Sequence, residues 1–416
     1  MNSTLGFQKL LVLNLPFRSD RRDAITLAAA TSNMKLEFVD GVTGESIRES
    51  AYPPPKENIK LPAGIRGSWR THMNALQRVV QENLTTALIF EDDVDWDVRI
   101  RQNLQRFALA SRFLSENKET LSHHSKYPLE KLKNPETPET GFHILSENGI
   151  TSDLPTMPLA SAARKNLQYK GKGSTTGVTS PYGDPSQWDI LWIGHCGAGF
   201  PRYPLDPHTK KTDVTASNVI LKHENDATVP LGKYLKAHPF QSVLDPLAHA
   251  YKPHTRVYHR ASGGELCTVG YAVSQRGARR LLHQFGIKDW NDIFDSAMGR
   301  WCASEDQKSS TPGTTANLVH GGGDGSAGGQ NPLVRYAGGK WNVRSKERVC
   351  LTSQPPIFAH HHPMDGESDI GGLGGGYATK YETKYLRLSV RMNLERIVQG
   401  IKNLVDQWPD EEKEKE

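Results

Sequence analysis

The chain lacks several features that would point to particular classes of protein. Its 416 residues contain no uninterrupted apolar run of about 18 residues, so we expect no membrane-spanning helix. The N-terminus has no charged segment followed by an apolar stretch, so we expect no secretory signal in this chain. The four cysteines lie far apart without a Cys-x-x-Cys pattern, which excludes the common zinc motifs and allows three disulfide pairings or none.

Charge is not concentrated in one block either. The net charge is +5, but no run of Lys and Arg is interleaved with aromatic residues, so a nucleic acid is not a favoured partner. Apolar residues make up 36% of the chain and charged residues 23%, which is typical of a globular protein with long loops. A chain of this length can form one large domain with insertions or two domains.

The most informative stretch is 85–97, with the sequence TTALIFEDDVDWD. Its apolar part, Leu88–Phe90, predicts a buried strand. A dense group of carboxylates follows, namely Glu91, Asp92, Asp93, Asp95 and Asp97. Carboxylates at the C-terminal end of a strand suit Mg²⁺ or Mn²⁺, and ligands bind at this edge of open α/β sheets. The alternative is a strand followed by a solvated acidic turn.

The N-terminal segment predicts a strand, a helix and a second, parallel strand. Lys9–Leu15 is a continuous apolar run of strand length, typical of a strand buried on both faces. Ser19 or Asp20 can cap a helix that runs to about Ser32. The short apolar segment Leu36–Val39 then predicts the second strand, joined by a right-handed crossover.

Three arginines follow the first strand, at the edge of the sheet where ligands are expected. The guanidinium groups of Arg18, Arg21 and Arg22 can hold a diphosphate. The alternative is that they belong to the solvated start of the helix.

A second helix is predicted after Gly64. Residues spaced four, three and four apart form one apolar stripe: Trp69, Met73, Leu76 and Val80. Ser68 is a candidate N-cap. His72 lies near the edge of the stripe, where it can be a packed residue or a ligand contact.

Further elements are predicted in the second half of the chain. Strands are expected at Trp188–Gly194, Thr255–Arg260 and Thr268–Ser274. Ser274 caps a helix over Gln275–Phe285, with Gly286 as its C-cap. Asp292 and Asp295 lie at the start of the next predicted helix, and their spacing places both carboxylates on one helical face.

Three consecutive histidines, His360, His361 and His362, directly follow a short apolar strand. Successive side chains of a strand point to opposite faces, so at most two of these histidines can serve one metal site. A last amphipathic helix is predicted by the spacing of Leu394, Ile397, Ile401 and Leu404.

Composition divides the chain into five segments. We expect 1–114 and 183–300 to be the two halves of one domain. The segment 115–182 is rich in polar residues and Pro and predicts a low-complexity insertion. The segment 301–347 predicts a Gly-rich flexible loop, and 348–416 holds the last strand, the His cluster and the last helix.

Together these residues resemble glycosyltransferase family 25, which includes lipopolysaccharide sugar transferases and collagen galactosyltransferases. The matching pieces occur in the order of the family: Leu13-Asn14-Leu15 with Arg18 and Asp20-Arg21, Asp40-Gly41, Thr71-His72, Leu88-Ile89-Phe90-Glu91-Asp92-Asp93, Trp188–Gly194, Gly270-Tyr271-Ala272-Val273-Ser274 and Gln354-Pro355-Pro356. The ending around Arg387–Leu394 is similar to the fungal branch.

The resemblance implies a GT-A-like, Rossmann-type α/β sandwich with a mostly parallel central sheet, in which 1–114 is the nucleotide-sugar-binding half and 183–300 the acceptor-side half. It also implies a UDP-sugar donor, a Mn²⁺ or Mg²⁺ ion, a glycan or glycoprotein acceptor and inversion at the anomeric carbon, with galactose as the guessed sugar. The nucleotide-sugar contacts that it implies are Asn14, Arg18, Arg21, Asp40, His72, Glu91 and Asp92. Asp93 is the expected principal metal ligand, with Asp95, His360 and His361 as further candidates.

An inverting transfer needs a base that deprotonates the acceptor hydroxyl. Asp292 and Asp295 are the candidate catalytic bases, and the alternative is that backbone N–H groups at a helix start satisfy both acids.

Two other functions are compatible with the residues. A metal-dependent phosphoesterase can be built on the acids and the His cluster, although we find no second dense His/Asp cluster for a two-metal centre. A non-catalytic UDP- or sugar-binding protein is the second alternative, against which the intact acidic run argues. Eukaryotic family members generally work in the Golgi or ER lumen, whereas a chain without a signal or anchor is expected in the cytoplasm unless its start is truncated.

Overall fold

The structure is a computed structural model of the chain. It describes residues 1–56, 60–116, 120–121, 130–131, 155–168, 180–199, 214–215, 219–235, 245, 247–261, 265–303, 348–362, 369–370 and 382–410. The predicted Gly-rich loop lies outside these residues from 304 to 347, as does the acidic end of the chain.

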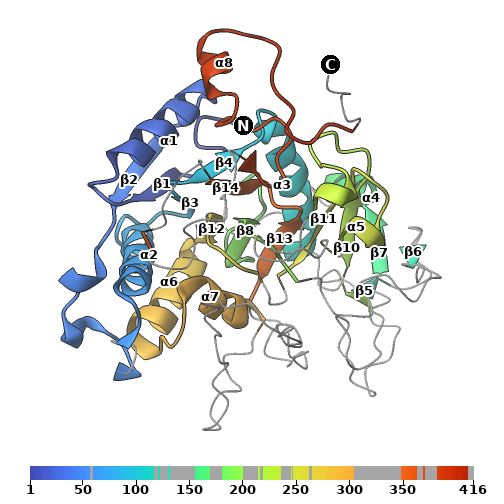
Figure 1. The fold of residues 1–416 in the computed structure, drawn as a ribbon. Helices are drawn as coiled ribbons and strands as arrows, with labels where there is room; N and C mark the ends of the chain where they lie inside the picture. Colours follow the sequence, from blue (N-terminus) through green and yellow to red (C-terminus); the bar gives the residue numbers. More distant parts are fainter. Residues whose placement is uncertain are drawn as a thin grey trace, which may run out of the picture.

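A large mixed sheet forms the centre of the molecule (Figure 1). Its main path runs β2-β1-β3-β12-β8-β13-β11-β10-β7-β6, and β4, β14 and β15 pair beside this path. The strands of the first half are β1 (Lys9–Asn14), β2 (Leu36–Asp40), β3 (Thr86–Glu91), β4 (Val94–Trp96), β6 (Glu130–Lys131) and β7 (Pro155–Pro158). Those of the second half are β8 (Ile190–Gly194), β10 (Ile220–His223), β11 (Arg256–Arg260), β12 (Gly270–Ser274), β13 (Cys350–Gln354), β14 (Phe358–His362) and β15 (Glu382–Thr383). A separate pair consists of β5 (Thr120–Leu121) and β9 (Val214–Thr215).

The N-terminal part has the predicted topology. Strand β1 pairs in parallel with both β2 and β3, so the three strands end at one edge of the sheet. Beyond β3 the strands run in both directions. Strand β12 is antiparallel to both β3 and β8, whereas β13 is parallel to β8. The sheet is therefore parallel at the N-terminal end and mixed over the rest.

Helices cover both faces of the sheet (Figure 1). Successive side chains of β3 show the two sides, since Leu88 and Phe90 pack in one core and Ile89 in the other. The first core includes residues of α1 (Ser19–Thr31) and α3 (Ile100–Glu116). The second includes residues of α2 (Ala63–Gln81), α6 (Gln275–His283) and α7 (Phe294–Cys302). This α/β/α arrangement confirms the predicted GT-A-like, Rossmann-type fold class.

The remaining helices are short. They are α4 (Leu159–Gln168), α5 (Leu247–Ala250) and α8 (Leu394–Val398), with single turns at Gly44–Ser46, Glu49–Ala51 and Gly232–Tyr234 and a π-type segment at Gln284–Lys288. No helix among the described residues is long and apolar enough to cross a membrane.

Several predicted helix ends were wrong. Helix α1 has Arg18 at the N-cap position rather than Ser19 or Asp20, and the Asp20 carboxylate instead accepts a 2.9 Å hydrogen bond from the Arg18 guanidinium. Helix α2 begins five residues before Ser68, directly after Pro62, so Ser68 lies inside the helix.

The C-terminal helix ends were also wrong. Helix α6 stops at His283 and continues as the π-type segment, so Gly286 is not a C-cap, whereas Ser274 does cap this helix by accepting from the Gly277 N–H. The predicted helix to Leu404 is limited to α8. Gly400 has a φ of +73°, which only glycine adopts readily, and it turns the chain out of the helix.

The predicted insertion 115–182 contains elements that the sequence pattern did not indicate, namely the two-residue strands β5 and β6, strand β7 and helix α4. Strand β7 pairs in parallel with β10, and α4 follows it directly and packs against α3. The described end of this segment returns to the core, where Tyr182 is buried and stacks on Phe7 with ring centroids 4.4 Å apart.

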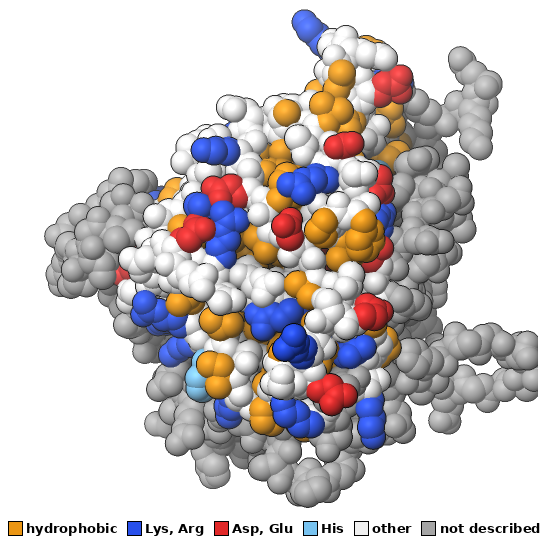
Figure 2. Space-filling model, turned by 90° about the vertical axis from the view of Figure 1, so that its left-hand side faces the viewer, with side chains coloured by type: hydrophobic (Ala, Val, Ile, Leu, Met, Phe, Trp, Pro, Cys, Tyr) orange, Lys and Arg blue, Asp and Glu red, His pale blue; other side chains and the backbone are white. Residues whose placement is uncertain are grey.

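The surface on the side of β2 and α1 is mixed in charge. Figure 2 shows Lys and Arg side chains interspersed with Asp and Glu over this face rather than gathered in one block. Ion pairs join some of them, as in Lys9 with Glu37 at 2.8 Å and with Glu82 at 2.7 Å.

A buried ion pair links the far half of the sheet to the segment between β13 and β14. The Asp226 carboxylate is fully buried and accepts hydrogen bonds from Arg256 at 3.1 Å and Arg106 at 3.0 Å. Burial by itself raises the pKa of Asp226, but Arg256, Thr228 and Arg106 together hold it below its ordinary value. Arg256 also donates to the Pro356 carbonyl at 3.0 Å, so this cluster orients the chain as it enters β14.

We expect Asp226→Ala to lower the free energy of unfolding by about 3–5 kcal/mol, because the Arg256 charge would stay buried without its partner. Urea denaturation followed by circular dichroism measures this loss. The matched control is Glu224→Ala, which removes the partly exposed carboxylate that pairs with Lys222 at 3.1 Å. The control should cost less than about 1 kcal/mol, and equal losses in the two variants would contradict the prediction.

Candidate active site

The C-terminal ends of the three parallel strands bring the first group of predicted residues together. Asn14 ends β1 and lies opposite Asp40, the last residue of β2. Glu91 ends β3 on the other side of β1. Asp40 is exposed to solvent, whereas Asn14 is 2% exposed. This edge is the one at which ligands bind in open α/β sheets.

The acidic turn, which consists of Glu91, Asp92 and Asp93, lies at the end of β3. It is held by one side chain from β1 and one from α1. Arg21 in α1 lies 2.8 Å from an Asp92 oxygen and 3.0 Å from an Asp93 oxygen. Asn14 donates a 2.8 Å hydrogen bond to the other Asp92 oxygen. Burial and the neighbouring Asp93 raise the pKa of Asp92. Asp92 thus points inward and is engaged by Asn14 and Arg21, while Asp93 is more exposed.

A strand from the other end of the chain completes the group. Strand β14 pairs antiparallel with β4, which places His360 opposite Val94. The Nε2 atom of His360 lies 3.3 Å from a Glu91 oxygen and 3.5 Å from an Asp93 oxygen. Ligand atoms of Glu91, Asp93 and His360 all lie within 4.8 Å of one another. Two carboxylates and one imidazole can therefore share a divalent ion at this point.

The surroundings of Glu91 and His360 favour a negative charge on the carboxylate and a positive charge on the imidazole. Burial raises the pKa of Glu91, but hydrogen bonds with His360 and His72 outweigh it and hold the pKa below its ordinary value. Burial lowers the pKa of His360, but Asp93 and Glu91 outweigh it and raise the pKa. The Glu91 carboxylate thus stays ionised and attracts positive charge, whether a protonated imidazole or a bound cation.

Two predicted metal ligands are not part of this group. Asp95 is fully buried and accepts from the backbone of Trp96 at 2.7 Å and from the hydroxyl of Ser389. His361 points to this side of the strand, with Nδ1 3.9 Å from Asp95, and burial lowers its pKa to about 4. Side chains of β14 alternate between faces, so the structure brings His360 to the acidic turn and takes His361 away from it.

His72 lies behind the acidic turn rather than at its surface. It is 1% exposed, with Nδ1 2.9 Å from the Tyr271 hydroxyl and Nε2 3.6 Å from a Glu91 oxygen. Thr268, between them, donates to Glu91 at 2.6 Å and lies 3.2 Å from His72 Nε2. His72 and Thr268 therefore orient the Glu91 carboxylate. In this structure the buried His72 ring contacts Glu91, Thr268 and Tyr271.

Arg18 lies at the same edge but farther out. Its guanidinium pairs with Asp20 at 2.8 Å and with Asp369 from the C-terminal part of the chain. Arg21, in contrast, contacts the acidic turn itself. The two arginines, which have the same predicted role, therefore have different surroundings.

The two candidate bases do not share a helical face, which corrects that prediction. Helix α7 begins at Phe294, after Asp292, whose carboxylate pairs with Arg300 at 2.7 Å. Asp295 is inside the helix and accepts hydrogen bonds from the backbone N–H groups of Cys267 at 2.7 Å and Ser296 at 2.6 Å. Burial raises the pKa of Asp295. Both acids therefore have partners within the fold, Asp292 in Arg300 and Asp295 in two backbone N–H groups.

Some residues around the site were not predicted from the sequence to lie there. Arg391 donates to the carbonyls of Val94 at 2.8 Å and Asp92 at 2.6 Å and so fixes the acidic turn from the C-terminal segment. A disulfide joins Cys196 to Cys267, next to Thr268. A second disulfide, between Cys302 and Cys350, ties α7 to β13.

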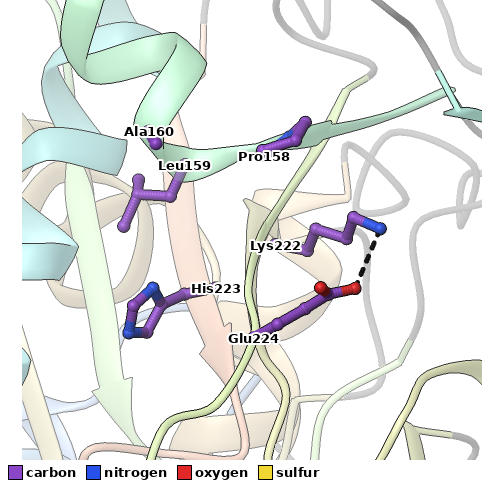
Figure 3. A pocket seen from close by; sticks show the side chains of 6 residues that line it. All are labelled: Pro158, Leu159, Ala160, Lys222, His223 and Glu224. Carbon is purple, nitrogen blue, oxygen red and sulfur yellow. Dashed lines mark hydrogen bonds and ion pairs between the residues drawn. The ribbon is translucent and has the colours of Figure 1, made fainter.

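One pocket among the described residues lies away from this site. It is lined by the end of β7, the start of α4 and the end of β10, namely Pro158, Leu159, Ala160, Lys222, His223 and Glu224. Figure 3 shows Lys222 and Glu224 paired on one side of it and His223 on the other. Strand β10 is separated from β3 by four strands of the sheet path, so this pocket and the acidic turn are separate sites.

Comparisons with known proteins match the N-terminal part of the chain. The family model described as glycosyltransferase family 25, LPS biosynthesis protein, matches residues 7–156. The human protein named inactive glycosyltransferase 25 family member 3 is 29% identical over 115 residues, which is 25% of this chain and 19% of that protein. Human procollagen galactosyltransferase 2 is 24% identical over 113 residues, or 24% of this chain and 18% of that protein. Xenopus laevis procollagen galactosyltransferase 1-A is 23% identical over 112 residues, again 24% and 18%.

These matches span about a fifth of the length of the curated relatives. The region matched by the family model includes β1 to β4 and therefore Arg21 and the whole acidic turn. Over residues 7–156 the chain matches the model of glycosyltransferase family 25, the family that its motifs resemble.

Proposed function

We propose that this protein is a metal-assisted, inverting glycosyltransferase that moves a sugar from a UDP-sugar to a hydroxyl of a glycan or glycoprotein. The observation that carries the proposal is the grouping of Glu91, Asp93 and His360 at the C-terminal edge of the parallel strands. The family supports the reaction class, and the names of the procollagen galactosyltransferases support galactose as the first sugar to test.

The donor set fits Mn²⁺ or Mg²⁺, because carboxylate oxygens suit both ions and imidazole suits Mn²⁺. Glu91, Asp93 and His360 would hold the ion, which supplies Lewis-acid stabilisation of the departing diphosphate. Asn14 and Asp40 lie opposite each other at the ends of β1 and β2, and their proposed role is to contact the nucleoside part of the donor. The proposed role of Arg18 and Arg21 is to contact the phosphates.

The remaining proposed roles are supporting ones. Thr268 and His72 hold the Glu91 carboxylate toward His360, and Arg21 neutralises part of the charge of Asp92 and Asp93. We do not assign the base to Asp292 or Asp295, because each of these carboxylates is engaged within the fold.

A binding protein without turnover is the second candidate function. One observation supports this candidate. The human protein named inactive glycosyltransferase 25 family member 3 is 29% identical to this chain over 115 residues. A phosphoesterase has less support, because the described part of the chain contains a single carboxylate–imidazole group rather than the two adjacent sites of a two-metal enzyme.

The first test is the release of UDP from UDP-galactose, UDP-glucose and UDP-N-acetylglucosamine, measured with Mn²⁺ or with EDTA. We expect slow hydrolysis of one donor that is lost with EDTA. Asp93→Ala should lower the rate at least about a hundredfold, because losing a metal ligand removes several kcal/mol of transition-state stabilisation. Asp23→Ala changes an exposed acid of α1 and serves as the control.

UDP binding without turnover, unchanged by metal and by Asp93→Ala, would contradict the transferase proposal and favour the binding protein. Release of phosphate from simple phosphoesters, without any dependence on the sugar, would favour the phosphoesterase.

A second prediction separates the neighbouring histidines. We expect His360→Gln to weaken Mn²⁺ binding by about tenfold or more, equivalent to roughly 1.4 kcal/mol, because the imidazole faces Glu91 and Asp93. His361→Gln should leave Mn²⁺ affinity nearly unchanged, since His361 faces Asp95 on the other side of the strand. Titration of Mn²⁺ followed by electron paramagnetic resonance of the free ion measures both affinities. A larger effect of the His361 variant would overturn the assignment of His360.

A further inference from the structure

His360 stands between the acidic turn and a disulfide. Its Nε2 atom faces Glu91 at 3.3 Å, and its Nδ1 atom lies 3.4 Å from the Sγ atom of Cys196. Cys196 is bonded to Cys267, and ligand atoms of Cys196, Cys267 and His360 all lie within 4.8 Å of one another. The two sides of one imidazole thus contact two chemically different groups, one made of hard oxygens and one made of sulfur.

The backbone positions of the two cysteines do not depend on the disulfide alone. The Cys196 N–H donates to the Leu266 carbonyl at 2.8 Å, within a short antiparallel bridge. The Cys267 N–H donates to the Asp295 carboxylate at 2.7 Å, and its carbonyl accepts from the Trp192 indole at 3.0 Å. Breaking the sulfur–sulfur bond therefore leaves the backbone of both cysteines held near His360.

We propose that reduction of the Cys196–Cys267 disulfide creates a binding site for a thiophilic divalent ion such as Zn²⁺, with the two thiolates and Nδ1 of His360 as ligands. Two thiolates and one imidazole are a ligand set that zinc accepts, and water can take the fourth position of the tetrahedron. Cys196 is 5% exposed and Cys267 is partly exposed, so the group lies close to the surface and is shielded on one side.

The chemistry needs a dithiol as reductant. The dithiol transfers two electrons and two protons to the disulfide, the bond between the two Sγ atoms breaks, and the reductant closes into its own cyclic disulfide. Binding of the ion then displaces one proton from each cysteine thiol.

Occupation of this site has a consequence for the acidic turn. A neutral imidazole offers one lone pair, so with Nδ1 bound to the thiophilic ion the Nε2 atom carries the hydrogen and can only donate, for example to Glu91. His360 then cannot be a ligand of the ion held by Glu91 and Asp93. This competition rests on the proposed function, whereas the thiolate site itself does not.

The test uses Co²⁺ as the probe, because cobalt bound to thiolates has a charge-transfer absorption in the near ultraviolet. Reduction of the wild type also opens Cys302–Cys350, so the protein to study is the full chain with Cys302→Ser and Cys350→Ser. Treated with a dithiol and desalted without oxygen, this variant should bind one Co²⁺ per chain with the thiolate absorption. Before reduction the absorption should be absent, and Zn²⁺ should abolish it in the reduced protein.

The matched variant carries Cys196→Ser and Cys267→Ser and keeps the other pair of cysteines. After the same reduction it should lack the absorption, and His360→Gln introduced into the first variant should weaken Co²⁺ binding. Absence of the absorption in the reduced first variant, or its persistence in the matched variant, would overturn the proposal. Loss of the native circular dichroism when Cys196–Cys267 is reduced would also contradict it, because the backbone contacts are argued to hold both cysteines.

The competition is measured separately with Mn²⁺. In the reduced first variant, one equivalent of Zn²⁺ should weaken Mn²⁺ binding, while in the oxidised protein the same Zn²⁺ should have a smaller effect. If the protein binds no Mn²⁺ in either state, the proposed function fails while the cobalt result still decides the thiolate site.

Discussion

The candidate site depends on the pairing of β14 with β4. This pairing joins two segments that are far apart in the chain, since His360 and Glu91 are separated by 269 residues. The His361 N–H also donates to the Asp93 carbonyl at 2.8 Å, so the backbone of the acidic turn is held as well as its side chains. Without this contact the acids would form only a turn at the end of a strand, and the imidazole would have no fixed position.

A second constraint acts from behind the acidic turn. Glu91 accepts from Thr268 and lies close to the buried ring of His72, which in turn contacts the Tyr271 hydroxyl. Thr268 directly follows Cys267, whose disulfide touches His360. The carboxylate and the imidazole are thus oriented through neighbouring positions of one short segment, which explains why polar groups with such low exposure are tolerated there.

The same arrangement links the function to the redox environment of the protein. Disulfides form and persist in oxidising compartments and are rare in reducing ones. Since one of the two disulfides contacts His360, the compartment would influence which atoms surround the imidazole. The proposed sugar transfer and the proposed reduction of this pair both involve His360.

The sequence by itself determined the parts of the protein that follow from local patterns. The apolar run at Lys9–Leu15 indicates a strand buried on both faces, and Leu88–Phe90 indicates a second buried strand whose end locates the acids at the ligand edge of the sheet. Only the tertiary structure placed His360 beside Glu91 and Asp93 and His361 beside Asp95, showed that Asp292 and Asp295 are engaged, and paired the cysteines. Those outcomes depend on contacts between distant segments, and strand register and side-chain direction at such contacts are set by packing that a local pattern does not contain.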